Sequence, residues 1–146
     1  MNNRACAWAA MVMTLGMCGI VDRAVAAEPP SAAEATVVPL MSRDLVGAPD
    51  KEALMLTVGY GPGGTSLPHR HDAQVFVYVL EGSMTMQVDG SPPVTLTAGQ
   101  TFYEAPDDVH RVSMNASKTH PAKILVFMIK AKSRPATIAV PPVAKP

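Results

Sequence analysis

The feature that most constrains this chain is a series of short apolar runs separated by turn-forming residues. The runs span residues 37–45, 52–60, 74–80, 83–88, 94–97, 101–103, 109–114 and 123–129. Glycine, proline or aspartate stands between nearly all of them, and no segment of this region combines a helical period with credible caps. About eight short strands at this spacing predict an all-β domain, a small antiparallel β-barrel or sandwich with little helix.

The N-terminal segment has the composition of a cleaved export signal. Arg4 precedes an apolar run over residues 5–21, and small residues follow at 24–27. We therefore expect residues 1–26 to be a signal peptide that is removed, which places the mature protein in the periplasm or outside the cell. Lipidation at Cys18 is disfavoured, because the preceding Met17 is bulkier than the small residue usual there.

Removal of this segment would leave one domain without cysteine. Both cysteines, Cys6 and Cys18, lie within the expected signal, so the mature chain would have neither a disulfide nor a thiol ligand. The expected organisation is a flexible leader over 27–35, a β-barrel domain over 36–130 and a proline-rich tail over 131–146. We expect the tail to be disordered or extended against a neighbour, since its prolines oppose regular ladders.

The numbers of basic and acidic side chains limit the kinds of molecule that the protein is expected to bind. The whole chain has 12 basic and 12 acidic side chains, and loss of Arg4, Arg23 and Asp22 with the signal would leave 10 and 11. A nearly neutral domain lacks the dense positive face that phosphate binding needs, so nucleic acid is not expected as a partner. The apolar run is short for a membrane span and is followed by charged residues, so we expect no stable span after processing.

Three of the four histidines are placed to converge on one site. His69 and His71 are two residues apart before a strand-like run, and alternate residues of a β-strand project to the same face. His110 lies in another strand-like run, which a folded sheet can bring opposite the first two. These three residues are candidate metal ligands; the alternative is a hydrogen-bonded core cluster without metal. His120 lies in a polar stretch and is expected in a surface loop.

The layout around these histidines resembles the two sequence motifs of the cupin superfamily. The first motif is carried here by Gly63, His69, His71 and Gly82, and the second by Gly99, Pro106, His110 and Asn115. Pro106 and Asn115 are each displaced by one residue, and Asp108 stands where glycine is usual. The resemblance covers roughly residues 36–130. It implies a small jelly-roll β-barrel with one metal ion inside, often in a homodimer that pairs outer strands.

The main departure from the family pattern lies in the strand after His71. Val75 occupies the position of the family's glutamate ligand, and its side chain is expected to point inward like that of His71. Gln74 is a candidate fourth ligand only if a bulge just after His71 shifts the register. Glu104, six residues before His110, could replace the absent ligand or act as a catalytic base if burial raises its pKa. The structural alternative is an exposed carboxylate at a strand end or a hydrogen-bond partner of a nearby amide.

A site with three histidines and no carboxylate would leave a divalent ion fully charged, which favours small anionic chelating molecules as guests. The ligands admit iron, manganese, nickel, copper or zinc. The leading hypothesis is a metal-dependent dioxygenase that acts on a small substrate chelated to the ion. The alternative is a binding module for metal or a small ligand without turnover, and a metal-free structural dimer is a third reading. Fold alone does not choose among them.

Two methionines suggest a different kind of metal chemistry. Met84 and Met86 are two residues apart, and thioether sulfur suits Cu(I), so they could belong to a copper-handling surface. The preferred interpretation is that they are flexible apolar filler in a small core.

Overall fold

The computed structural model describes residues 35–141, which form ten β-strands. One antiparallel sheet has the order β1 (Thr36–Leu45), β2 (Ala48–Tyr60), β9 (Ala122–Ala131), β4 (Ala73–Glu81) and β7 (Thr101–Glu104). The other has the order β10 (Ile138–Ala139), β3 (His69–Arg70), β8 (Val109–Asn115), β5 (Ser83–Val88) and β6 (Val94–Thr97). The described residues contain no helix, and so none that could cross a membrane.

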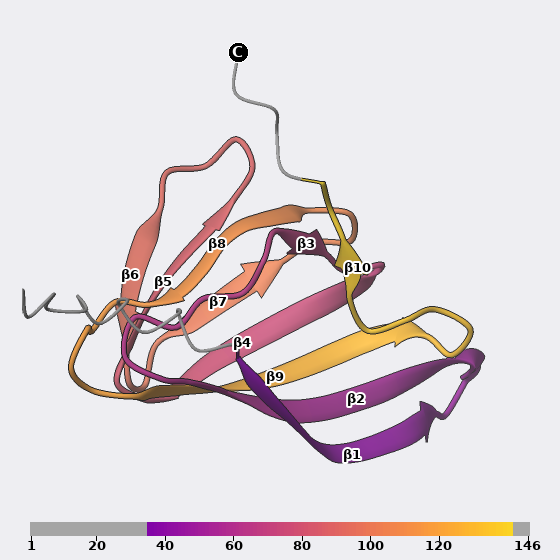
Figure 1. Cartoon of the computed structure of the whole chain (residues 1–146). Coiled ribbons are helices and arrows are strands. Elements are labelled where there is room, and N and C mark those ends of the chain that lie inside the picture. The colour runs from indigo at the N-terminus through magenta and orange to yellow at the C-terminus, as the bar shows by residue number, and fades with distance from the viewer. Residues whose placement is uncertain (1–34, 142–146) are drawn as a thin grey trace, which may run out of the picture.

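The two sheets face each other as the layers of a jelly roll, with β2, β9 and β4 below β3, β8 and β5 in the view of Figure 1. Within the described residues, strand pairing does not close them into a continuous barrel. The prediction of an antiparallel all-β domain is confirmed, with ten strands instead of about eight. The additional strands, β3 and β10, are two residues long and too short to show a period in the sequence.

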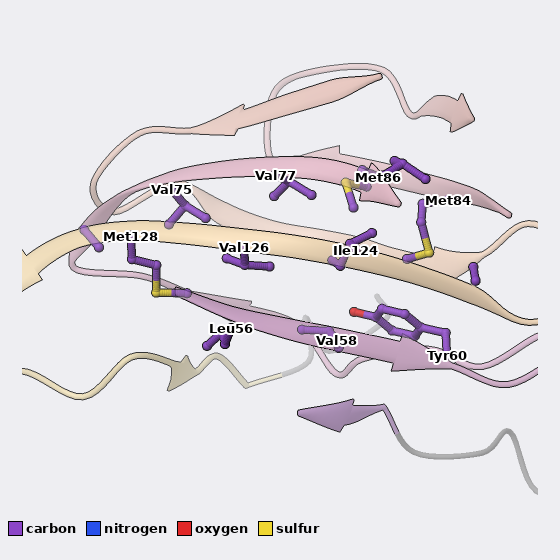
Figure 2. Close-up of a cluster of buried hydrophobic side chains, with 13 residues drawn as sticks. Leu56, Val58, Tyr60, Val75, Val77, Met84, Met86, Ile124, Val126 and Met128 are labelled. Carbon is purple, nitrogen blue, oxygen red and sulfur yellow. The ribbon is translucent and has the colours of Figure 1, made fainter. Parts of the chain in front are cut away.

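The apolar core lies between the sheets and is built by alternation along the strands. On β4, Val75, Val77 and Val79 are buried, whereas Phe76 and Tyr78 are 42% and 44% exposed on the outer face. Strand β4 pairs with β9, so the inward side chains of both strands form one continuous aliphatic wall (Figure 2). The period of two read from the sequence therefore sets the inner and outer faces.

Gly82 carries the chain from β4 in the first sheet to β5 in the second. Its φ of +73° lies in the left-handed region, and a Cβ atom there would stand 2.5 Å from the carbonyl oxygen of Pro121. Glycine is the residue that tolerates both conditions. The motif glycine thus permits the close crossing between the two sheets.

The segment after β9 returns across the domain. Strand β10 pairs with β3 through Ile138 with Arg70 and Ala139 with His69, and Figure 1 shows it beside β3. The prolines of this tail lack the amide hydrogen needed for hydrogen bonds between strands. Ile138 and Ala139 have it and can therefore pair with β3. The expected signal peptide and most of the expected leader, residues 1–34, lie outside the described residues.

Candidate functional site

His69 and His110 stand opposite each other in the second sheet. They are register partners between β3 and β8, and their ring centroids are 5.2 Å apart. The ring of His71, just after β3, lies 4.9 Å from that of His69. The structure therefore brings together the three histidines that the sequence analysis singled out.

Backbone carbonyl groups fix two of the rings. Nδ1 of His69 lies 2.8 Å from the carbonyl oxygen of Leu67, and Nδ1 of His71 lies 2.5 Å from that of Ala136. Because a carbonyl oxygen only accepts, each Nδ1 carries the hydrogen and each Nε2 keeps a lone pair. The returning C-terminal segment thereby orients one of the candidate metal ligands.

His110 differs because its Nδ1 partner is a carboxylate. That nitrogen lies 3.1 Å from Oε1 of Glu104, which accepts its hydrogen. Nε2 of the same ring is buried and has no hydrogen-bond partner. The ring also stacks on Phe102, with 5.8 Å between centroids and 23° between the planes. A buried nitrogen without a partner is costly, and it marks a position that a ligand or ion would satisfy.

Glu104 reaches the histidines from the opposite sheet. It is the register partner of Val75 between β4 and β7, so it stands beside the position where the family's glutamate is missing. Its side chain is 2% exposed, and its unpartnered Oε2 lies 3.6 Å from Nε2 of His71. The site therefore contains a carboxylate, which agrees with the alternative in which Glu104 replaces the absent ligand.

The electrostatics favour an ionised carboxylate beside a neutral imidazole. Burial by itself would raise the pKa of Glu104, but the hydrogen bond that His110 donates and the proximity of the three imidazole rings outweigh it and lower that pKa. Burial lowers the pKa of the His69 imidazole. Glu104 is thus suited to be an anionic ligand. The lowered pKa does not match the raised pKa that the hypothesis of a catalytic base assumed.

The other candidate residues lie away from the histidines. Gln74 is exposed on the outer face of β4, whose register with β9 runs without interruption from Ala73 to Val79, so no bulge turns it inward. His120 is exposed in a loop, as predicted. Met84 and Met86 are fully buried in the core (Figure 2), which supports the reading of apolar filler.

The histidines line a cavity of about 420 Å³ between the sheets. Most of the residues that line it are apolar, and the largest share of these comes from β2, β4 and β9. A second polar group in the wall consists of Tyr60, Ser66 and Ser113, which the sequence analysis did not identify. The sequence feature that could have pointed to the two serines is their distance from the histidines: Ser66 stands three residues before His69 and Ser113 three residues after His110.

The donor atoms of the three histidines and Glu104 suit a divalent transition metal. In the structure, however, the histidine side chains lie around the Glu104 carboxylate and not around a common position for an ion. Within residues 35–141, no group of three or more histidine, cysteine, aspartate or glutamate side chains is arranged to hold a metal ion as it stands. Nε2 of His71 and Oε2 of Glu104 are both lone-pair atoms, and a cation between them would remove their repulsion. The four side chains therefore fit a cation by their chemistry.

The sequence model of the Cupin domain matches residues 56–128, which is half of the chain. The chain belongs to the cupin family. The matched part of this cupin contains all three clustered histidines and Glu104. No curated protein matches the sequence.

Solved structures share the cupin fold. The DMSP lyase DddQ from Ruegeria pomeroyi is 19% identical, covering 76% of this chain and 54% of its own, with a TM-score of 0.59. A Klebsiella pneumoniae protein with a double-stranded beta-helix domain is 20% identical over 77% of this chain and 90% of its own (TM-score 0.58). Recombinant oxalate oxidase in complex with glycolate is 24% identical over 76% and 56% (TM-score 0.57). The chain spans about half the length of the lyase and the oxidase.

Proposed function

We propose that this cupin binds a divalent transition metal through His69, His71 and His110 and acts as a dioxygenase on a small chelating substrate. Glu104 is the carboxylate that balances the charge of the ion. The observation that carries the proposal is a set of lone-pair atoms on side chains that line one cavity: three imidazole Nε2 atoms and the unpartnered Oε2 of Glu104. Iron, manganese, nickel, copper and zinc accept such ligands.

The protein's own residues position the donors and surround them with apolar side chains. Hydrogen bonds at Nδ1 hold each ring in the tautomer that leaves Nε2 free, which is the usual arrangement of metal-binding histidines. A bound ion supplies Lewis acidity and, for a redox-active metal, electrons for dioxygen chemistry. The aliphatic wall, with Val75, Val77 and Val126, offers water no hydrogen bonds, which favours a low local polarity and suits an apolar gas such as dioxygen.

The size of the cavity limits the substrate to a small molecule. A volume of about 420 Å³ accommodates a small organic ligand but not a polymer segment. Oxalate oxidase, which has the same fold, is known in complex with glycolate. That complex supports a substrate class of small molecules with oxygen donors that can chelate a metal.

Oxygen uptake tests the enzymatic part of the proposal. The protein loaded with Fe(II) is incubated with diketones, flavonols and small thiols while dissolved oxygen is recorded. We expect substrate-dependent oxygen consumption that His71→Ala reduces by at least roughly tenfold, since a metal ligand is lost. His120→Ala, which changes an exposed histidine, should leave the rate unchanged. Saturable binding of these compounds without oxygen consumption would contradict a dioxygenase.

A binding module without turnover is the second candidate function. The observation that favours it is that, among the described residues, the four side chains do not form a ready-made metal sphere. In that case a cationic or hydrogen-bonding ligand would occupy the position beside Glu104 directly. Equal ligand affinity in metal-loaded and metal-free protein would identify this function.

We also propose that the chain forms a homodimer through the outer face of its first sheet. Phe76 and Tyr103 are half exposed there, with ring centroids 5.3 Å apart, and Phe127 lies 6.1 Å from Phe76. Exposed aromatic patches of this kind are typical of contact surfaces. Sedimentation should find a dimer that Phe76→Asp converts to a monomer. A monomeric native protein would contradict this assignment.

Export to the periplasm or medium is part of the same proposal. It is supported by the sequence of residues 1–26, where a basic residue, an apolar run and small residues follow one another. Mass spectrometry of the protein isolated from its native compartment should find a chain that begins near Ala27. A cytoplasmic chain that retains residues 1–26 would contradict it.

A further inference from the structure

Three hydroxyl groups form a second polar cluster in the wall of the cavity. The hydroxyl of Tyr60 lies 3.0 Å from that of Ser66 and 3.0 Å from that of Ser113. Tyr60 and Ser113 are 4% and 3% exposed, and all three residues line the cavity. The cluster joins β2, the loop before β3, and β8.

The backbone already holds these segments together. The amide of Ser66 donates to the carbonyl oxygen of Ser113 at 2.9 Å, and Thr65 forms a β-bridge with Met114. Alanine and phenylalanine in place of the serines and of Tyr60 would keep these backbone contacts and most of the packing. The hydroxyl groups are therefore not the only contacts that hold these segments together.

The hydrogen-bonding capacity of the cluster exceeds its internal contacts. Three hydroxyl groups carry three hydrogens, and the two contacts among them use two, which leaves one O–H to donate and several lone pairs to accept. Among the residues that line the cavity in the described part of the chain, none is lysine or arginine. A carboxylate at this cluster would be buried without a countercharge, whereas a neutral oxygen would be satisfied.

We propose that Tyr60, Ser66 and Ser113 form a subsite for a neutral hydroxyl or carbonyl oxygen of the substrate. The inference rests on the proposed function for the other end of the substrate, which chelates the metal at the histidines. The aliphatic wall lies in the same cavity as both polar groups. The substrate class is therefore a small bifunctional molecule with an anionic chelating head, a short aliphatic middle and a neutral oxygen at its far end.

Paired chelators of graded length test the subsite. Zinc-loaded protein is titrated calorimetrically with hydroxamates from butano- to octanohydroxamate, each with and without a hydroxyl at the chain end. At the length that spans the cavity, the terminal hydroxyl should tighten binding about fivefold, as expected for one net hydrogen bond. A terminal hydroxyl that weakens binding at every length would overturn the proposal, because it would then enter an apolar wall.

Variants locate the effect. Tyr60→Phe removes only the central hydroxyl and should abolish the preference for the hydroxylated probe, and Ser113→Ala should reduce it. Tyr78→Phe, which removes a hydroxyl from the outer face of the same sheet, is the control and should keep the full preference. An unchanged preference in a folded Tyr60→Phe or Ser113→Ala protein would also overturn the proposal.

A metal-free measurement separates this inference from the proposed function. Metal-free protein is titrated with n-butanol while the amide chemical shifts of Ser66 and Ser113 are followed by NMR. Shifts that Tyr60→Phe removes would support the subsite even if zinc and hydroxamates fail to bind, a failure that would count against the metal site alone. Absence of shifts in the native protein would overturn the subsite.

Discussion

The inner faces of the two sheets differ in chemistry. All but two of the 13 members of the buried apolar cluster belong to the sheet of β1, β2, β9, β4 and β7, and the exceptions are Met84 and Met86 on β5. The opposite sheet presents polar side chains to the interior, among them His110, Ser113 and Asn115. One sheet thus supplies most of the apolar burial that stabilises the domain, and the other supplies most of the groups that can bind a ligand.

The polar residues themselves fall into two kinds. The side-chain amide of Asn115 donates to the carbonyl oxygens of Gly61 and His120 at 2.9 and 2.7 Å, so its capacity is used to fix loops. Nε2 of His110 and Oε2 of Glu104 are equally buried but have no partner. Polar groups whose hydrogen bonds are satisfied within the protein thus differ from buried polar atoms that still need a partner and can bind a ligand. Among the atoms named here, Oε2 of Glu104 belongs to the second group and comes from the sheet that contains β4 and β7.

The largest expected effect is on the free energy of unfolding and comes from truncating a buried methionine of β5. Met86 is fully buried, so Met86→Ala should lower the free energy of unfolding by about 2–5 kcal/mol through lost burial and the cavity left behind. Met86→Leu, which nearly conserves volume, should cost less than about 1.5 kcal/mol. Urea denaturation followed by circular dichroism measures both. A small loss in the alanine variant would show that the second sheet does not depend on Met86 for packing.

The second prediction concerns the carboxylate of Glu104, which can be removed or moved to the neighbouring strand β4 by substitution. Glu104→Gln keeps the shape but removes the charge, so metal affinity should fall about 10–100-fold. Because Val75 and Glu104 are register partners, the double variant Val75→Glu, Glu104→Val returns the carboxylate to the family's position and should recover most of the affinity. Glu81→Gln, on an exposed glutamate of β4, is the matched control. Competition with a chromogenic chelator measures the affinities.

This prediction has a clear contrary result. If Glu104→Gln binds metal as tightly as the native protein, the carboxylate serves only to orient His110 and does not balance the charge of an ion.

The smallest expected effect concerns two ion pairs, one within the first sheet and one at the end of β5. Hydrogen bonds from Lys130 and Ser42 lower the pKa of Glu52 in the first sheet, and those from Arg111 of β8 lower the pKa of Asp89 in the turn after β5. A carboxyl group with a lowered folded pKa stabilises the protein above its unfolded pKa of about 4, and that stabilisation is lost as the pH falls through the folded value.

The urea midpoint of the native protein should therefore fall between about pH 5 and about pH 3, and Glu52→Gln or Asp89→Asn should each make that fall slightly shallower. Lys130, the partner of Glu52, is buried, whereas Arg111 and Asp89 are more exposed, so Glu52→Gln should have the larger of the two effects. A pH profile that neither substitution alters would show that these pairs contribute nothing measurable.

Much of the fold and part of the site could be predicted from the sequence, for identifiable physical reasons. The period of two along β4 fixes which side chains face inward, and two histidines at that spacing must share a face. The role of Glu104 could not be decided, because it depends on β7 pairing with β4, and a strand's own pattern does not reveal its neighbour. Strand β10 is too short to show a period, and Ser66 and Ser113 have the composition of ordinary loop and strand residues.

The metal content of the purified protein tests the central claim most directly, that side chains from the two sheets together hold an ion. Elemental analysis of the native protein should find about one divalent transition metal ion per chain, and the double variant His69→Ala, His71→Ala should retain less than roughly a tenth of it. His120→Ala should match the native value. Equal metal in native and double-variant protein, or none in either after incubation with each of the five metals, would contradict the account.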